Sequence, residues 1–331
     1  MGNRATPPRS FNTIRQTQYK KRAQREMHRR ILLLAICAVL ILIFLAVSVL
    51  LVCSIVDAIG NSISDDSGTP QDQPNEPKQP IQYQQITKDQ AAVGYGPLIL
   101  INGTHEYHFP SDAERTLEII SEHRPKDNGT NIYQINIESP PSIAKMQTEA
   151  LSFFNEMMLK YYEIYGDGSI NISSAYRSRK DQESYSAAPG FSDHHSGYCI
   201  ALDSVDSSHW IYENCKKYGF IPRYPDNKVN ETGIDNYEEC FRYVGVAHAT
   251  YITRNDLCLE EYVALLQEEY DSENHLRITG ADGNEYEVYY VSVSKDDEVS
   301  TFSVPANYSY TVSGDNEGGF IVTVNLSDPL N

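Results

Sequence analysis

Two adjacent histidines, His194 and His195, lie in the Ser- and Gly-rich stretch PGFSDHHSGYCIALD, residues 189–203. A short apolar run follows them and ends at Asp203. Imidazoles in a loop, followed by a carboxylate at the end of a strand, are ligands from which proteins build zinc sites. The stretch is therefore a candidate zinc site, and the alternative is a pair of histidines without a metal.

Two further segments carry side chains that zinc chemistry needs. The segment SSAYRSRKDQ, residues 173–182, places Arg177 directly after a predicted strand, and YEECFRYVG, residues 237–245, contains carboxylates and a thiol. Hydrolysis of a peptide bond at zinc requires three protein ligands and an open position for water. It also requires a carboxylate that takes the water proton and a cation near the carbonyl oxygen. The three segments together offer groups of each kind.

The elements that would position these segments alternate irregularly between helix and strand. Apolar residues at helical spacing predict a helix over residues 142–166, and the alternation in SINISSAYRS predicts a strand that begins at 169 and runs up to Arg177. Further helices are expected over 207–220 and 257–270, with a β-rich stretch at 240–245 between them. This order lacks the regular βαβ repeat of a parallel sheet. The sequence therefore predicts a single α+β domain with mixed helices and antiparallel strands.

The regions that flank this domain differ from it in composition. Residues 57–95 are rich in Pro, Gln, Asp and Ser, which predicts a disordered linker. The segment PLILING, residues 97–103, predicts a strand closed by a turn and opens a domain that extends over residues 96–270. Residues 271–331 contain short alternating strands separated by Gly, Asn and Asp turns, which predicts a small all-β extension.

The N-terminal part of the chain predicts a membrane anchor. Residues 1–30 carry nine Lys or Arg against one Glu, and residues 31–56 contain no charge. That apolar run exceeds the ~20 residues that span a bilayer, and the basic flank predicts a cytoplasmic N-terminus with the C-terminal domain outside the cell membrane. The run is too long for the apolar part of a cleaved signal peptide. The expected localisation is therefore a single-pass membrane protein.

The charge and the cysteines restrict the partners of the outer region. The whole chain carries −18 and the basic segment 1–30 carries +8, so the remainder carries −26. Such a surface is a poor match for nucleic acid, whereas wall polymers, peptides and cations remain candidates. Four of the six cysteines lie in the predicted outer region, where they could form disulfides, stay free or bind metal. These are Cys199, Cys215, Cys240 and Cys258.

Taken together, the motifs SAYRSRKDQ, PGFSDHHSG, YGFIPRYP and FRYVGVAHA resemble, in this order, those of the VanY-type zinc D-alanyl-D-alanine carboxypeptidases. The resemblance implies an α+β peptidase domain, zinc as the cofactor, and peptidoglycan stem peptides as the substrate. It also implies the site residues. These are His194, Asp203 and Cys240 as metal ligands, Glu238 and Arg177 as catalytic residues, and Tyr176, Gln182 and Ser192 as substrate-binding residues. His195 is expected to be solvated and not to bind metal.

The chain departs from the family pattern at two ligand positions. The family places its Asp ligand seven residues after the first His, where this chain has Ala201, and Asp203 follows two residues later. Strand geometry puts Asp203 on the same face but ~6.6 Å further along, so it could bind zinc only after a local rearrangement. Cys240 stands where the family has a third ligand, a His. Cysteine binds zinc as a thiolate, but a disulfide with Cys199 could instead replace the metal.

Two functions therefore remain open at the level of sequence. The first is a membrane-anchored D-alanyl-D-alanine carboxypeptidase with an altered or impaired zinc site. The second is a non-catalytic pseudopeptidase that binds wall peptides or a protein partner through the region of Arg177.

Overall fold

The structure is a computed structural model, and it describes residues 79–110, 116–137, 143–203, 209–235, 239–294 and 296–330. The predicted cytoplasmic segment, the apolar run at 31–56 and most of the predicted linker lie outside the described residues. Within the described ranges, the helices are too short or too polar to cross a membrane.

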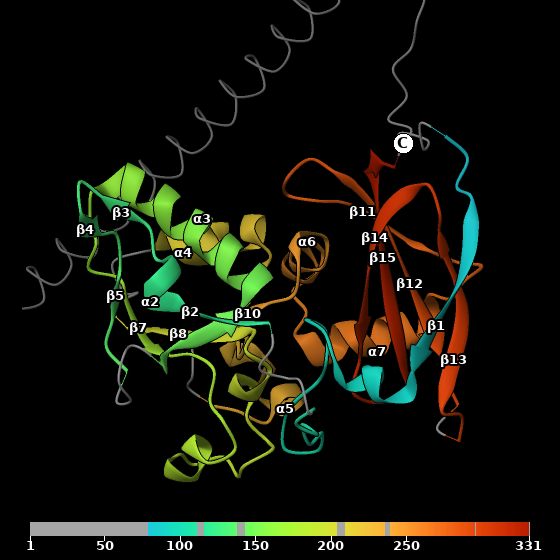
Figure 1. Ribbon diagram of the computed structural model, residues 1–331, viewed down its shortest axis with the longest axis horizontal. Helices are drawn as coiled ribbons and strands as arrows, with labels where there is room; N and C mark the ends of the chain where they lie inside the picture. The colour runs from blue at the N-terminus through green and yellow to red at the C-terminus, as the bar shows by residue number, and fades with distance from the viewer. Residues whose placement is uncertain are drawn as a thin grey trace, which may run out of the picture. The chain divides into compact units, whose positions relative to one another are not determined.

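A five-stranded sheet forms the centre of the α+β part (Figure 1). Its order is β5-β7-β8-β10-β9, in which β5 and β7 are parallel and the other neighbours are antiparallel. The mixed helix and antiparallel-sheet architecture agrees with the α+β prediction. The strands are β5 (Gln134–Ile135), β7 (Asn171–Ser174), β8 (Cys199–Asp203), β9 (Phe220–Pro222) and β10 (Cys240–Tyr243).

Helix α3, Thr148–Tyr165, packs against one face of this sheet and confirms the helix predicted there (Figure 1). Gly166 ends the helix in a left-handed conformation, with φ of 62°. The buried side of α3 shares a core with the β-strands because alternate residues of β8, Ile200 and Leu202, point toward it. The other face of β8 carries Cys199 and Ala201, so the strand separates a hydrophobic core from the candidate site.

Smaller elements complete the α+β part. The predicted helix at 207–220 is α4 followed by a short 3₁₀ helix, and the predicted helix at 257–270 is α7. Helix α6 follows β10 directly and was not predicted. The remaining elements of this part are β2 (Leu117–Ile119), α2 (Ile120–His123), β3 (Lys126–Asp127), β4 (Thr130–Asn131), β6 (Lys145–Gln147), α4 (His209–Asn214), α5 (Val229–Thr232), α6 (Val246–Arg254) and α7 (Leu259–Glu269).

The C-terminal region is all-β, but it includes a strand from before the peptidase part. Strand β1, Tyr83–Asp89, pairs antiparallel with β13 although the whole peptidase part lies between them in the sequence (Figure 1). This strand falls inside the segment predicted as a disordered linker, so the prediction is wrong for residues 83–89. The four-stranded sheet beside it has the order β11-β12-β15-β14. Its strands and β13 are β11 (Leu276–Thr279), β12 (Glu285–Ser292), β13 (Val299–Pro305), β14 (Tyr308–Gly314) and β15 (Gly319–Pro329).

The β region shares a hydrophobic core with helices α6 and α7. Leu276, Val288 and Ile321 of the β-strands pack into one buried cluster with apolar residues of both helices. His248 of α6 reinforces this contact, because its ring nitrogens lie 2.7 Å from the Tyr262 hydroxyl and 2.8 Å from the Thr323 hydroxyl. The C-terminal region is thus packed against the α+β part and is not an independent extension.

The segment 97–103, predicted as a strand, begins in a turn at residues 97–98 and joins no sheet of the described chain. Its buried residues Leu98 and Ile101 explain the apolar pattern. The predicted turn is present, since Asn102 forms an isolated bridge with His105. Carbonyls of this segment are hydrogen-bonded by Arg242 instead of a neighbouring strand, which local hydrophobic patterning could not reveal.

Candidate metal centre

The loop that carries the two histidines is fixed by His195. This side chain is completely buried, and its Nδ1 donates to the carbonyl of Arg177 at 2.7 Å. Its Nε2 accepts a hydrogen bond from the Gly190 amide at 3.0 Å. Both ring nitrogens are therefore occupied in the neutral form. The prediction that His195 does not bind metal agrees with this arrangement, but the prediction that it is solvated is wrong.

His194, Cys199 and Cys240 form a compact group of potential metal ligands. One ligand atom from each residue lies within 4.8 Å of the others, and all three residues are buried. The Nδ1 atom of His194 lies 2.9 Å from the carbonyl oxygen of Ala175, which can only accept a hydrogen bond. This contact holds the ring through Nδ1, as outer hydrogen bonds hold metal-binding histidines, and the ring also hydrogen-bonds with the backbone of Cys199.

The register of β8 and β10 explains why the two thiols meet. Cys240 lies opposite Ala201, and Arg242 lies opposite Cys199. Opposite residues of an antiparallel pair point to the same face of the sheet. Cys199 and Cys240 are therefore diagonal neighbours on the face that His194 approaches from its loop.

The predicted ligand Asp203 lies outside this group. Its Cα pairs with Asn171 of β7, and its carboxylate accepts a hydrogen bond from the Asn171 amide at 3.3 Å. Strand β8 is paired as far as Asp203, and the one irregularity of its pairing with β7 lies in β7. Asp203 therefore stays two residues beyond Ala201, the position of the family's Asp ligand. The ligand set that the described structure brings together is thus His194, Cys240 and Cys199, whereas the predicted set contained Asp203.

Arg177 lies beside this group in a rigid frame. Its Nε and Nη2 donate to the Ser174 hydroxyl at 3.0 and 2.7 Å, and its Nη1 donates to the Gln182 carbonyl at 3.3 Å. The guanidinium also stacks on the Tyr185 ring, 3.5 Å from its centroid. Gln182 is fully buried, and its amide nitrogen donates to the Ala187 carbonyl. The structure therefore shows Gln182 orienting Arg177.

A cavity of about 260 Å³ opens next to the guanidinium. Tyr176 and Arg177 line it, as do residues of β7 and of the turn that follows. Ser192 lies in the buried part of the histidine loop, where its carbonyl accepts from the His195 amide at 3.0 Å. Glu238, the predicted catalytic base, lies outside the described residues, so its role stays a prediction.

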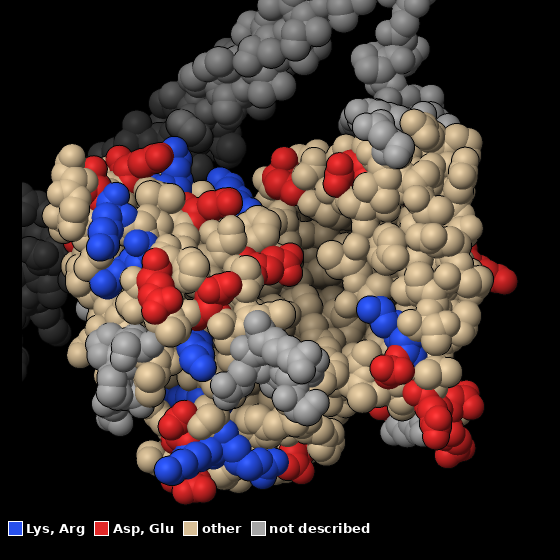
Figure 2. All heavy atoms as spheres, in the orientation of Figure 1, with Lys and Arg blue, Asp and Glu red and all other residues tan. Residues whose placement is uncertain are grey.

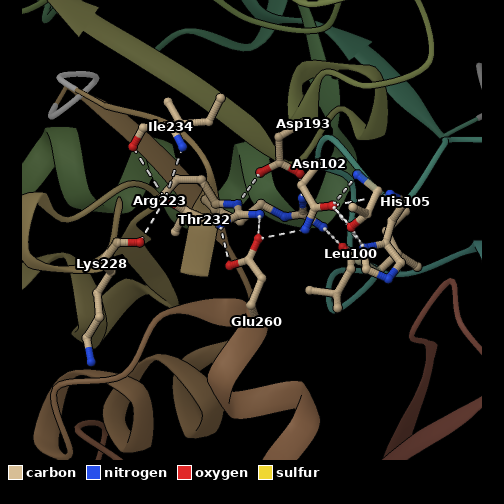
Figure 3. A network of polar contacts seen from close by, with 12 residues as sticks. Leu100, Asn102, His105, Asp193, Arg223, Lys228, Thr232, Ile234 and Glu260 are labelled. Atoms are coloured by element: carbon tan, nitrogen blue, oxygen red, sulfur yellow. Dashed lines mark hydrogen bonds and ion pairs between the residues drawn. The ribbon is translucent and has the colours of Figure 1, made fainter. Parts of the chain in front are cut away.

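A buried network of charges includes Asp193, the residue before His194 (Figure 3). Asp193 contacts two fully buried arginines, Arg223 through Nε at 2.9 Å and Arg242 through Nη1. Arg223 also forms two parallel hydrogen bonds with the carboxylate of Glu260 on α7, at 2.7 and 2.9 Å. Asn102 donates to the same carboxylate at 3.0 Å. The network joins the histidine loop to β9, β10, α7 and the segment at 97–103.

Burial and neighbouring charges shift the pKa values in the two regions. Burial, reinforced by Arg177, lowers the pKa of His194 well below its usual value. Burial and the adjacent Cys240 raise the pKa of the Cys199 thiol. Burial alone would raise the pKa of Glu260, but the Arg223 guanidinium outweighs it and lowers that pKa. These shifts favour the neutral forms of His194 and Cys199 and the ionised form of Glu260.

Sequence reasoning missed the roles of several residues. The family pattern places no ligand at Cys199, so the resemblance does not identify it as a member of the ligand set. Arg223 and Arg242 belong to the motifs YGFIPRYP and FRYVGVAHA, yet nothing local in those motifs shows that both contact Asp193.

Outside this network, Lys and Arg side chains lie among Asp and Glu on the face of the α+β part shown in Figure 2.

Comparison with known proteins places this fold and site in a family. Residues 111–246 match the family described as VanY, D-alanyl-D-alanine carboxypeptidase. A D-alanyl-D-alanine carboxypeptidase of Enterococcus faecium is 32% identical over 258 residues, which cover 73% of this chain and 79% of that protein. The chain therefore belongs to the VanY family of D-alanyl-D-alanine carboxypeptidases.

Two further relatives extend the comparison. The bifunctional D-Ala-D-Ala dipeptidase and carboxypeptidase VanXYC of Enterococcus gallinarum is 30% identical over 124 residues, which cover 28% of this chain and 65% of that protein. The crystal structure of the vancomycin-resistance D,D-dipeptidase VanXYg with a D-Ala-D-Ala phosphinate analogue superposes with a TM-score of 0.61. It covers 74% of this chain and 99% of that chain at 23% identity, a likeness of fold.

Proposed function

We propose that this protein is a zinc-dependent carboxypeptidase that removes the terminal D-alanine from peptidoglycan stem peptides. Membership of the VanY family supports the proposal, as does the activity named for the Enterococcus faecium relative. The main support is structural. His194 and Cys240 come from separate motifs but lie together, beside the guanidinium of Arg177, which hydrogen bonds hold in place.

The arrangement supplies the groups that such a reaction needs. Zinc held by His194 and cysteine thiolates would lower the pKa of a bound water and polarise the substrate carbonyl. Arg177 would stabilise negative charge on the substrate, and its fixed guanidinium requires no reorganisation. The cavity of about 260 Å³ beside it is the proposed place for the end of the peptide. Glu238 remains the proposed proton acceptor.

Hydrolysis of a peptide ending in D-Ala-D-Ala tests this function through Arg177. Arg177→Ala should lower kcat/KM about 100-fold or more, as loss of a group that stabilises transition-state charge does. Arg179→Ala is the matched control, because Arg179 lies two residues away, has a side chain 54% exposed and pairs with Glu106. Released D-alanine is the readout. Equal rates for the two variants, measured with zinc present, would contradict the role of Arg177.

A non-catalytic pseudopeptidase is the second candidate. Ala201 at the family's Asp position and the burial of His194, Cys199 and Cys240 favour it. In that case, zinc-loaded wild-type protein should release no D-alanine. It should still bind the peptide, with weaker binding in Arg177→Ala because a guanidinium pairs with a carboxylate.

We also propose that residues 31–56 anchor the protein in the cell membrane with the N-terminus in the cytoplasm. The support is the uncharged run and its basic flank. Protease added outside intact cells should remove the C-terminal domain and leave the basic segment 1–30 protected. A mature chain that begins after residue 56 would contradict the anchor.

A further inference from the structure

The two cysteines and the histidine of the candidate centre suit a metal better than they suit a disulfide. Cys199 and Cys240 are diagonal neighbours across an antiparallel strand pair, a relation with Cα atoms typically ~7–8 Å apart. Disulfides require Cα atoms about 4.4–6.8 Å apart. The register therefore disfavours a direct sulfur–sulfur bond, yet it brings both thiols within 4.8 Å of the His194 ring nitrogen.

The three ligand atoms lie slightly further apart than they would around a tetrahedral metal ion, so a small inward movement would form the site. Zinc–sulfur bonds of ~2.3 Å and zinc–nitrogen bonds of ~2.0–2.1 Å place the ligand atoms roughly 3.6–3.8 Å apart. The three ligand atoms would each move by about 1 Å or less to reach it. By contrast, Asp203 is held at the far end of β8 through its pairing with Asn171.

Charge and orientation also favour a cation at this position. One divalent ion with two thiolates and a neutral imidazole has no net charge, so the complex suits a buried position. The carbonyl of Ala175 holds the His194 ring through Nδ1, as outer hydrogen bonds hold metal-binding histidines. Arg242 lies opposite Cys199 in the strand register, and its Nε is buried without a partner among the described atoms.

From this geometry we infer that the protein binds a thiophilic d¹⁰ cation of the zinc class through His194, Cys199 and Cys240. The site replaces the Asp ligand with a thiolate two residues earlier on the same face of β8. This inference rests on the proposed function for its biological setting, but the ligand set stands on the structure alone. Two thiolates also predict a preference for Cd²⁺ and Zn²⁺ over hard cations such as Mg²⁺.

Cadmium titration of the full-length protein, purified with a reductant, tests the ligand set without reference to activity. Thiolate-to-cadmium charge-transfer absorption in the ultraviolet should rise to saturation at one equivalent. Cys199→Ser and Cys240→Ser should each weaken Cd²⁺ binding by more than about 100-fold, beyond the effect of losing an outer-shell partner. Zinc content after dialysis should fall in the same two variants.

Two matched variants separate this ligand set from the alternatives. Asp203→Ala should keep one equivalent of metal with full charge-transfer intensity. Cys215→Ser changes another buried cysteine, outside the ligand group, and should also keep it. Circular dichroism shows whether each variant is folded, and the wild-type titration tests the site even if a cysteine variant is not.

The outcomes are distinct for the site and for the function. Loss of metal in Asp203→Ala with retention in Cys199→Ser would overturn the inference, and so would wild-type protein that binds no Cd²⁺ after reduction. Metal bound through both thiolates without D-alanine release would support the inference and contradict the proposed function. Peptide hydrolysis retained in Cys199→Ser would support the function and contradict the ligand set.

Discussion

Two buried polar regions adjoin each other in this protein, and they differ in how their charge is compensated. Asp193 belongs to a network in which two carboxylates face two guanidinium groups, all nearly or fully buried. The next residue, His194, belongs to a group with two thiols and no carboxylate among the ligand atoms. The charges of the network are compensated within the protein, whereas the ligand group itself contains no charged side chain and could take up a cation.

This difference separates the part of the site that builds the loop from the part that binds. Arg223 and Arg242 fix Asp193 from two strands, so the loop conformation depends on charges within the chain. His194 then enters the ligand group from a loop that is already in place. Removing a charged side chain such as Asp193 should therefore destabilise the buried network. Adding a metal cation should stabilise the group formed by His194 and the two thiols.

The largest effect is expected from Asp193→Asn. The substitution removes the carboxylate between two fully buried arginines, so that Arg242 loses its acidic partner and Arg223 keeps only Glu260. Breaking a buried ion pair in this way costs about 3–5 kcal/mol in the free energy of unfolding. Urea unfolding followed by circular dichroism measures it.

Glu163→Ala is the control, since Glu163 also pairs with a basic side chain, Lys160, but both side chains are more than half exposed. This variant should leave the unfolding midpoint unchanged. An Asp193→Asn protein as stable as Glu163→Ala would show that the buried network is not needed for stability.

An intermediate effect is expected from zinc. If zinc binds the native ligand group and not the unfolded chain, a concentration 100 times its Kd stabilises the protein by about 2.7 kcal/mol. Thermal unfolding with and without zinc, under reduction, measures the gain. Cys199→Ser should show none, and Asp203→Ala should show the full gain. A gain of equal size in Cys199→Ser would place the ion elsewhere.

The sequence predicted the elements better than it predicted their partners. The stripe of apolar residues in α3 and the alternation before Arg177 depend on local periodicity, and both elements are present. The strand β1 was missed because its burial is slight and its partner, β13, lies beyond the whole peptidase part in the sequence. The segment 97–103 has the local pattern of a buried strand, although its burial comes from apolar neighbours and its carbonyls bond to Arg242.

The candidate site shows the same limit. Motif order identified His194, Arg177 and Cys240, and the structure brings His194 and Cys240 together with Arg177 beside them. The third ligand was assigned to Asp203 from the family's residue types, whereas Cys199 meets the others through the register of β8 against β10. Register depends on the pairing of whole strands, which a single motif does not contain.

The smallest effect concerns the acid dependence of the network through Glu260. Arg223 lowers the pKa of Glu260 below its ordinary value despite burial. A carboxylate with a depressed pKa in the folded state stabilises the protein above the unfolded-state pKa, and that contribution is lost as the pH falls through the folded value. The Glu260→Gln variant has no carboxylate at this position, so its stability contains no such pH-dependent contribution. The stability difference between wild type and Glu260→Gln should therefore be constant near neutral pH and narrow below about pH 4.5.

Urea unfolding of both proteins between pH 7 and pH 3 measures this difference, and the slope for one proton is at most about 1.4 kcal/mol per pH unit. Glu163→Gln is the control, because Glu163 pairs with Lys160 where both side chains are more than half exposed and solvent screens the pair. Its difference from wild type should be small throughout the range. A gap for Glu260→Gln that stays constant down to pH 3 would mean that Arg223 does not depend on the Glu260 charge. In that case Asp193 alone would balance the charge of the two buried arginines.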